Sequence, residues 1–447
     1  MYRCSESLLQ ADNPSTIAGR ESPGRAIALA ALRASIKLPI IAYYNKLMVM
    51  TMLSARSRLW LTVILVACAW LLPACATKTW QHDAIDSVPF KDRAQTTVEG
   101  DLRVTAAVPG EAETETIFGL PLYKRGIQPV WLEIENRSSF PIRYAPVGTD
   151  RNYFSPLEVS YVHRSGYSDE AREQMDRFFH GITMPRLIPP GETRSGFVFT
   201  HARPGTKGFN VDLFGPNQDQ EYSFLFFIDV PGFTPDHASV DFDALYSADE
   251  IRSLDSAGLR KELAAFSCCS SSDASNDERG DPVNVVVVGE SDDVLYALLR
   301  ADWFETARNS DASAFFLYGR RADALFYQER GDDRIELRLW LSPLQHDGKQ
   351  VWMGQINNQI KNKSGDLSMD PEVDDAAVYF MQNLWYSQSL LRYAFSAGPG
   401  EVSMENMRKD FRGERYFTTG FRAVLWVSPE PVSLLETVNE VWDKPPL

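Results

Sequence analysis

The sequence predicts a multidomain protein in which an N-terminal all-β sandwich is followed by an α+β domain. Two observations lead to this expectation. Residues 100–231 form short alternating apolar and polar runs separated by turn residues, whereas residues 281–427 mix strand-like and helical spacing. Without its first 74 residues the 447-residue chain keeps 373, which is enough for two domains of about 100–200 residues each.

Residues 48–76 have the order of an export signal. Arg56 and Arg58 precede an apolar run at residues 59–72, and the small residue Ala74 precedes Cys75. This run of 14 residues is shorter than the roughly 20 that a helix needs to span a bilayer. A spanning anchor is therefore the poorer interpretation, and we expect residues 48–74 to be a signal peptide.

The Leu72-Pro73-Ala74-Cys75 box resembles that of bacterial lipoproteins, which implies a diacylglyceryl thioether on Cys75 and an acyl chain on its amino group. An ordinary cleaved signal with an accidental cysteine is the alternative. By the same resemblance, Ala76 implies sorting to the outer rather than the inner membrane. Residues 1–47 show no periodic pattern, and we interpret them as an extension assigned upstream of the true start. Residues 75–99 would form a tether.

The expected β-sandwich covers residues 100–235. Its strands are predicted at residues 102–106, 130–134, 196–200, 209–214 and 222–230, with Pro- and Gly-rich turns between several of them. One helix is expected at residues 168–179, because Ser168 can cap its amides and acidic residues fill its first turns.

Residues 236–280 are expected to be a helical connector and its loop. The capping-box pattern at residues 247–250 predicts a helix start, and Leu259, Leu263 and Phe266 share one helical face. The adjacent Cys268 and Cys269 have three interpretations: two small buried residues at a helix end, a disulfide between neighbours, or a soft-metal site. We favour the first.

The α+β domain is predicted at residues 281–447. The β-branched run 283–288 indicates a strand covered on both faces, and a helix follows from Ser291 to about Trp303. A short strand is expected at 315–318. Asp347-Gly348 between the runs 334–341 and 351–360 predicts a hairpin. A long helix at 371–395 and a strand at 417–427 complete the expected layers.

Charge excludes one class of partner. The chain has 45 Lys and Arg against 60 Asp and Glu, and its first 74 residues contain 8 and 3 of these, so residues 75–447 carry a formal charge of −20. Such a surface repels phosphate backbones, and we expect no nucleic-acid partner. Membrane attachment would depend on acyl chains, of which two suffice for stable anchoring.

Several ordered motifs in the second domain resemble the LssY-like C-terminal domain, a bacterial envelope-associated family. The matching stretches are residues 281–289, 317–323, 338–340, 351–354 and 370–374. The resemblance implies an envelope location and an α+β fold, and it brings no established reaction. Members often carry histidines where this chain has Glu336, Ser368 and Met369, so it implies no histidine chemistry here.

The predicted hairpin yields the first candidate binding residues. With the turn at Asp347-Gly348, Arg338 would lie opposite Asn357 and Trp340 opposite Gln355. Alternation then places the polar residues and one tryptophan on a single face, with leucines on the other. This face is either a binding surface, since Arg and Trp dominate interface hot spots, or an ordinary solvated sheet face.

The other candidate binding residues are Arg320, Asp323, Asp370 and Asp374. Asp370 before Pro371 has the pattern of a helix cap, which accounts for the acidic residues without catalysis. Alternatively, an Arg and Asp cluster could bind a phosphate or carboxylate through Arg, or a hard divalent cation through Asp. We favour structural pairing over a site.

No phosphate-binding loop, nucleophile elbow or zinc-protease helix occurs, so we expect no catalytic residue, metal or cofactor. The favoured hypothesis is a lipid-anchored, periplasm-facing envelope protein that acts as a binding or assembly module with an envelope protein partner. A hydrolase that acts on a phosphorylated or lipid substrate through an Arg and Asp cluster is the alternative. A convergent pocket would favour the hydrolase; dispersed ion pairs would favour the binding module.

Overall fold

The computed structural model describes residues 78–217, 219–273, 279–307, 315–361 and 365–442. The chain divides into two compact units between Ala76 and Thr77, and every described residue belongs to the second unit. The extension at 1–47, the signal at 48–74 and Cys75 lie outside the described residues. Within the described ranges, no helix combines the length and apolar character that crossing a membrane requires.

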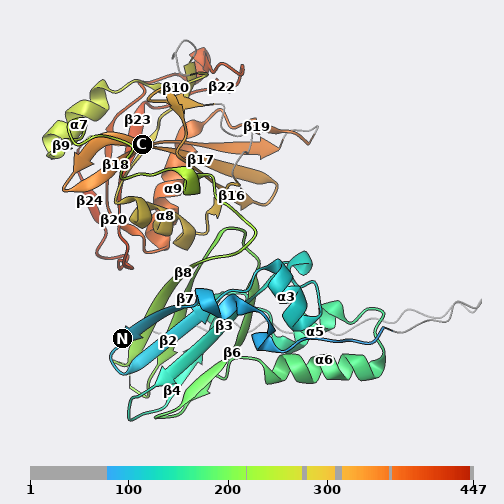
Figure 1. Cartoon of the computed structure of the whole chain (residues 1–447). Coiled ribbons are helices and arrows are strands. Elements are labelled where there is room, and N and C mark those ends of the chain that lie inside the picture. Colours follow the sequence, from blue (N-terminus) through green and yellow to red (C-terminus); the bar gives the residue numbers. More distant parts are fainter. Residues whose placement is uncertain (1–77, 218, 274–278, 308–314, 362–364, 443–447) are drawn as a thin grey trace, which may run out of the picture. The chain divides into compact units, whose positions relative to one another are not determined.

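Two four-stranded antiparallel sheets form the N-terminal half (Figure 1). The first has the order β1-β2-β3-β6, at Gln95–Glu99, Leu102–Ala107, Ile127–Asn136 and Thr193–His201. The second has the order β5-β4-β7-β8, at Leu187–Ile188, Ile142–Ala145, Thr206–Phe214 and Glu221–Asp229. One hydrophobic core is shared by the two sheets and includes Val104, Leu132, Val211 and Phe226. All five expected strand segments fall in this pair of sheets.

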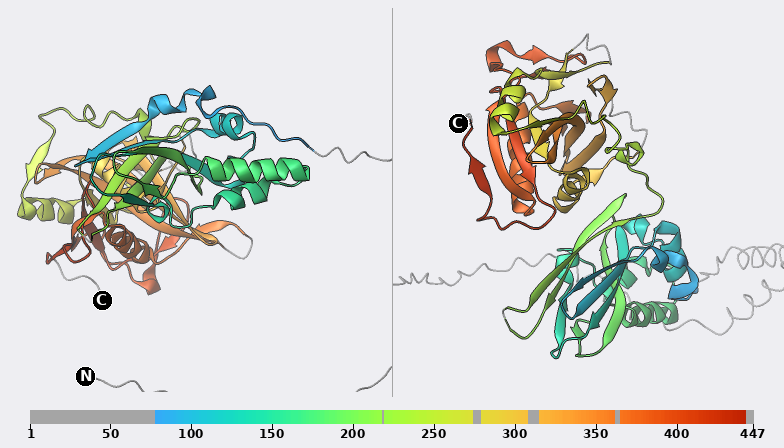
Figure 2. Two further views of the ribbon diagram at one scale, coloured as in Figure 1. Left: turned by 90° about the horizontal axis from the view of Figure 1, so that it is seen from below. Right: turned by 60° about the vertical axis from the view of Figure 1, so that its left-hand side comes forward.

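Four α-helices accompany these sheets, where the sequence predicted one. They are α3 (Glu111–Phe118), α4 (Pro146–Thr149), α5 (Pro156–His163) and α6 (Asp169–Gly181). Helix α6 is the expected one, and the Ser168 hydroxyl caps it. Helices α3, α5 and α6 gather on the same side of the sheets (Figures 1 and 2), and their apolar residues pack on Trp131 and Phe197 of the first sheet. The missed helices are short, so each has too few apolar positions to show a periodicity.

The connector contains less helix than expected. Up to the disulfide its elements are a 3-10 helix at His237–Ser239, strand β9 (Arg252–Leu254) and helix α7 (Ser256–Ala265). The predicted helix start at Ser247 is wrong: Glu250 accepts hydrogen bonds from the Ser247 amide and hydroxyl, but the backbone forms an isolated turn. Helix α7 begins instead after Asp255, whose carboxylate accepts from the Gly258 amide at 2.7 Å. Leu259 and Leu263 of the predicted apolar face are fully buried, whereas Phe266, the third residue assigned to it, lies just after the end of the helix.

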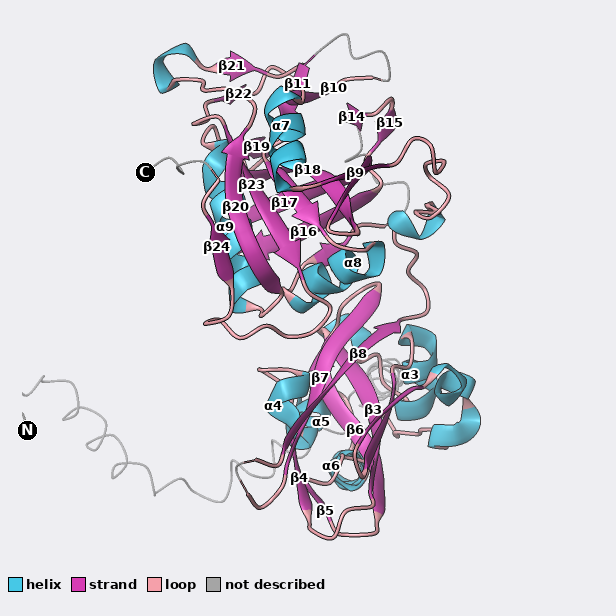
Figure 3. Ribbon diagram, turned by 90° about the vertical axis from the view of Figure 1, so that its left-hand side faces the viewer, coloured by secondary structure: helices cyan, strands magenta, loops and turns pink. Residues whose placement is uncertain are grey.

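A ten-stranded mixed sheet organises the C-terminal half (Figure 3). Its main path is β13-β16-β17-β18-β12-β23-β20-β24, with β19 on β18 and β9 on β17. In path order the strands are Phe304–Glu305, Ala324–Arg330, Asp333–His346, Lys349–Lys361, Val285–Val288, Phe421–Val427, Leu390–Ala397 and Val438–Glu440, and β19 is Leu367–Met369. Helices α8 (Ser291–Arg300) and α9 (Val373–Tyr386) share one core with the sheet, and α7 shares the other.

Strand β12 confirms the prediction of a strand covered on both faces. It runs antiparallel to β18 and parallel to β23. Val285 and Val287 belong to the core beneath α8 and α9, whereas Val286 and Val288 belong to the core beneath α7. All four valines are essentially inaccessible, which is why the strand lacks polar alternation.

The predicted 25-residue helix at 371–395 is wrong in its second half. Helix α9 ends at Tyr386, Gln388 takes a left-handed conformation with φ 60°, and the chain returns as strand β20. Strand β20 pairs with β23 along its length, and this distant pairing outweighs the local helical pattern.

The β17–β18 hairpin has the expected turn and a shifted register. Asp347 and Gly348 have φ 52° and 74°, as the tight hairpin turn requires. An irregularity between Leu341 and Gln345 shifts the pairing, so that Arg338 faces Gln355 rather than Asn357. The shift spans two residues and therefore preserves which side chains share a face.

Two small sheets complete this half. One has the order β11-β10-β14-β15, at Arg279–Pro282, Cys269–Ser271, Phe316–Leu317 and Arg320–Arg321. The other pairs β21 (Arg408–Lys409) with β22 (Arg415–Tyr416). Short 3-10 helices occur at Ile85–Ser87, Pro89–Arg93, Tyr123–Arg125, His237–Ser239 and Met404–Asn406. Strand β10 carries Cys269, and β22 carries the tyrosine that contacts it.

Candidate functional site

Arg320 and Asp323 form a tight ion pair with structural partners. Arg320 Nε and Nη2 each donate to one Asp323 oxygen at 2.8 Å. The same guanidinium donates to the Tyr246 hydroxyl at 2.9 Å and to the Leu341 carbonyl at 2.6 Å. Burial lowers the pKa of Arg320, but the hydrogen bond and charge of Asp323 outweigh burial and raise it. Both groups are therefore engaged in joining β15 to β17.

Trp340 and Arg338 are buried, and neither lies on an open sheet face. Trp340 is fully inaccessible, packs in the core beneath α7, and donates from Nε1 to the Arg320 carbonyl at 3.3 Å. Arg338 is 2 % exposed, donates to Glu336 at 2.6 Å and lies 4.5 Å from the Phe315 ring centroid. Burial lowers the pKa of Arg338. The solvated-face alternative is wrong, because other segments cover this side of the sheet.

Asp370 and Asp374 have separate structural roles. Asp370 accepts from the Glu372 amide at 3.1 Å, and α9 begins only at Val373, so Asp370 is not the N-cap that the Asp-Pro pattern predicted. Asp374 accepts from the Thr418 hydroxyl at 2.7 Å and the Thr419 amide at 2.6 Å. These bonds tie the first turn of α9 to the segment before β23.

The structure brings together a buried charged cluster that the sequence did not single out. Asp281, which is 1 % exposed, accepts from Arg412 Nη2 at 3.1 Å and from Asn357 Nδ2 at 2.8 Å. Arg412 also donates to Asp410 at 2.7 Å. Burial raises the pKa of Asp281; Arg412 and Arg338 oppose this effect, and Asp410 adds to it. The one sequence signal that pointed to this cluster was the position of Asp281 at the start of the motif stretch 281–289.

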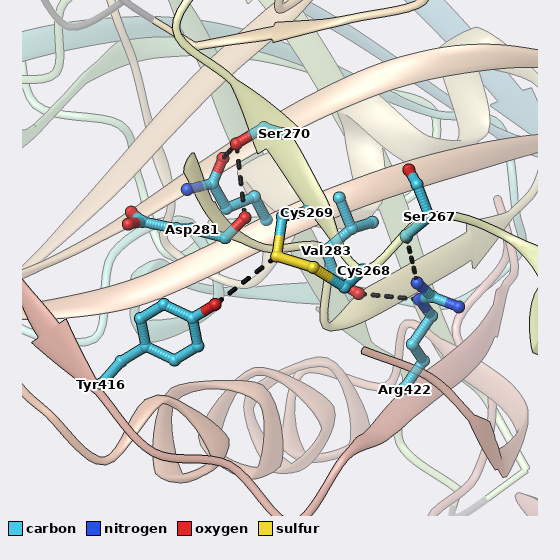
Figure 4. The surroundings of a disulfide bond; sticks show 9 residues. Ser267, Cys268, Cys269, Ser270, Asp281, Val283, Tyr416 and Arg422 are labelled. Atoms are coloured by element: carbon cyan, nitrogen blue, oxygen red, sulfur yellow. Dashed lines mark hydrogen bonds between the residues drawn. A yellow bond between two sulfur atoms is a disulfide. The ribbon is translucent and has the colours of Figure 1, made fainter. Parts of the chain in front are cut away.

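Cys268 and Cys269 are joined by a disulfide (Figure 4). This overturns the expectation of two free buried cysteines and settles the alternative of a bond between neighbours. Cys269 Sγ lies 3.5 Å from the Tyr416 hydroxyl. Nearby, the fully buried Arg422 donates to the carbonyls of Ser267, Leu263 and Val283 at 2.6, 2.5 and 2.8 Å. Arg422 thus ties the backbone that leads into the disulfide to the neighbouring segment at Val283.

A cavity of about 570 Å³ opens beside this disulfide. Its lining includes both cysteines, Tyr318, and two arginines, Arg279 of β11 and Arg408 of β21. Across the described ranges, no group of three or more His, Cys, Asp or Glu side chains is arranged to hold a metal ion. The lining of the cavity combines sulfur, aromatic and cationic groups, a combination that suits a small ligand.

The six candidate residues thus occupy three separate places in a strand-rich chain: the Arg320–Asp323 pair with Trp340, the buried Arg338, and the two aspartates beside α9. Residues 307–421 match the model of the LssY C-terminus family, which confirms the resemblance for this segment. The match covers about a quarter of the chain and contains four of the five motif stretches, with 281–289 before it. No curated protein matches the chain.

Proposed function

We propose that the protein is a lipid-anchored, periplasm-facing binding or assembly module of the bacterial cell envelope, without catalytic activity. In this proposal the N-terminal half is a β-sandwich and the C-terminal half an α+β domain. Cys75 carries the lipid, and the outer membrane is its destination. The LssY C-terminus match at residues 307–421 supports the nature of the C-terminal domain, and the envelope location is what the resemblance to that family implies.

One observation favours a binding role over hydrolysis. The Arg and Asp candidates do not converge on a pocket: Arg320 and Asp323 satisfy each other, Arg338 is buried, and Asp374 bonds the segment at Thr418. A hydrolase needs carboxylates or bases that reach a bound substrate. Side chains that are already paired within the fold support a scaffold instead.

The hydrolase remains the second candidate because of the cluster formed by Asp281, Asp410 and Arg412. It places two carboxylates beside arginines, an arrangement that active sites share. However, Asp281 is 1 % exposed and does not line the cavity beside the disulfide. Its geometry is that of an interior ion-pair network.

Crosslinking in intact cells, followed by purification of the tagged full chain, tests the proposal. We expect a stoichiometric envelope protein partner with wild type, and loss of membrane attachment in Cys75→Ser. Arg338→Ala is a poor surface probe because Arg338 is buried. Exposed apolar side chains serve better: Leu157 and Tyr161 in the N-terminal half, Tyr386 and Leu435 in the C-terminal half.

Alanine substitution of each pair separately would show which half makes the contact. One double variant should lose the partner while the other, which removes comparable exposed apolar surface, should keep it. If neither wild type nor any variant captured a partner, the binding role would be rejected. Turnover of phosphomonoester or lipid ester substrates by wild type, abolished in Asp410→Asn, would instead establish the hydrolase.

A further inference from the structure

The cavity beside the Cys268–Cys269 disulfide contains two cationic groups with no acidic partner among the described residues. Arg279 and Arg408 both line it, and neither takes part in an ion pair there, whereas the adjacent Arg412 is bound by Asp281 and Asp410. In a chain with a formal charge of −15, two such guanidinium groups at one cavity are a site for negative charge.

Strand pairing directs Arg408 toward this cavity. In the β21–β22 hairpin Arg408 is opposite Tyr416, and Lys409 is opposite Arg415. Side chains alternate along a strand, so Arg408 and Tyr416 share the face that meets Cys269, while Lys409 and Arg415 point to the other. Burial raises the pKa of the Tyr416 hydroxyl, and Arg408 and Arg279 act against that rise, which places both arginines near it.

The apolar side of the cavity is held in place before any ligand arrives. The disulfide links Cys268 to Cys269, and Arg422 clamps the carbonyls of Ser267 and Val283 around it (Figure 4). Phe266 and Tyr318 lie against each other at 5.9 Å between centroids and both line the cavity. A fixed apolar wall costs little ordering entropy on binding.

We propose that this cavity binds a small organic oxyanion, either a carboxylate or a phosphate monoester, that also has an apolar portion. The charged group lies between Arg279 and Arg408, and the apolar portion lies against the disulfide and Tyr318. The volume of about 570 Å³ is within the range of small-molecule sites. This site goes beyond the envelope role, because it requires neither the lipid anchor nor a protein partner.

Calorimetric titration of the full chain with phenyl phosphate and with benzoate tests the site and separates the two oxyanions. Benzyl alcohol and inorganic phosphate are the probes that lack the charge or the apolar portion. We expect one aromatic anion to bind. The double variant Arg279→Gln with Arg408→Gln should weaken the affinity for that anion by about tenfold or more, since each lost charged hydrogen bond costs about that factor.

Lys409→Gln with Arg415→Gln is the matched control. This double variant also removes two positive charges, but from the opposite face of the β21–β22 hairpin, and Lys409 lies on the same strand as Arg408. It should change the affinity by less than about twofold. Equal weakening in both double variants, binding of benzyl alcohol as strong as that of the aromatic anion that binds, or no binding of either aromatic anion would overturn the proposal.

A second measurement does not depend on how the variants fold. A dithiol reductant gives two electrons and two protons to the disulfide, becomes a cyclic disulfide itself, and leaves Cys268 and Cys269 as thiols. Alkylation of the peptide that contains both thiols then follows the rate in wild type. Saturating aromatic anion should slow reduction at least about threefold by covering the sulfur atoms. An unchanged rate would also overturn the proposal.

Discussion

The Asp323 carboxylate accepts hydrogen bonds from Nε and Nη2 of Arg320, and its Oδ2 also accepts one from the Leu341 amide at 2.8 Å. One carboxylate therefore joins the short strand β15 to the long strand β17. It is 4 % exposed, so water cannot replace the bonds that a substitution removes.

Asp323→Asn should lower the free energy of unfolding by about 2–4 kcal/mol, because it leaves a partly buried arginine without its opposite charge. The control is Asp332→Asn, which breaks a surface pair with Lys361 in which the aspartate side chain is 82 % exposed. This change should cost less than about 0.5 kcal/mol. Urea unfolding followed by tryptophan fluorescence compares the two, and equal costs would contradict the buried role of Asp323.

Arg338→Met should destabilise the fold rather than remove a binding contact. The substitution removes the buried guanidinium that pairs with Glu336 at 2.6 Å and lies near Asp281, so these carboxylates keep only Arg334 and Arg412 as cationic partners. Breaking a buried pair in this way should cost about 3 kcal/mol. Arg334→Met is the control on the same strand and face, because its side chain is 31 % exposed and stacks on Tyr327. It should cost about 1 kcal/mol or less. A folded Arg338→Met protein with wild-type stability would count against this account.

Gly354→Ala should destabilise the central sheet more than Gly348→Ala. A Cβ at Gly354 would collide with Val285 of β12 and meet Leu339 of β17 at 3.0 Å, so we expect a cost of about 1–3 kcal/mol from overpacking. At Gly348 a Cβ meets nothing within 4 Å, and only the left-handed φ of 74° opposes alanine, at about 1 kcal/mol. Thermal unfolding of both variants measures the order, and the reverse order would show that β12 yields more easily than its packing indicates.

The stability of the N-terminal half should depend on pH through Lys207. Lys207 is 3 % exposed and donates to the His201 carbonyl at 2.7 Å, and burial lowers its pKa to about 7, with Arg203 adding to the effect. Between pH 7 and 10.5, the ordinary pKa of lysine, the unfolded chain binds this proton and the folded chain does not. Stability contributed by this group therefore rises with pH across that window and is lowest below pH 7.

Lys207→Met should flatten this rise and stabilise the protein at pH 6 by roughly 1–3 kcal/mol, since it removes a buried charge. The exposed Lys261 of α7 supplies the control, Lys261→Met, which should leave the pH dependence unchanged. Urea midpoints measured from pH 6 to pH 10 decide the matter. A wild-type-like rise in Lys207→Met would assign the dependence to another group.

The chemistry of neighbouring residues along the chain was sufficient to predict several structural elements. The β-branched run at 283–288 predicted the doubly covered strand found at Val285–Val288, Asp347-Gly348 predicted the turn, and Ser168 predicted the start of α6. Each of these depends on neighbours along the chain: side-chain branching, a left-handed turn, or a hydroxyl within reach of the next amides. For the same reason the LssY-like segment was recognisable from ordered short motifs.

The tertiary structure alone decided which of these surfaces are open and which groups meet. The bulge after Leu341 changed the partner of Arg338, the covering segment at Phe315 buried its face, and pairing with β23 turned the expected helix end into β20. The cavity beside the disulfide is lined by residues that are far apart in the sequence, such as Cys268 and Arg408. A sequence pattern records local preference, whereas burial and pairing arise from contacts between distant residues, whose energies exceed local propensities.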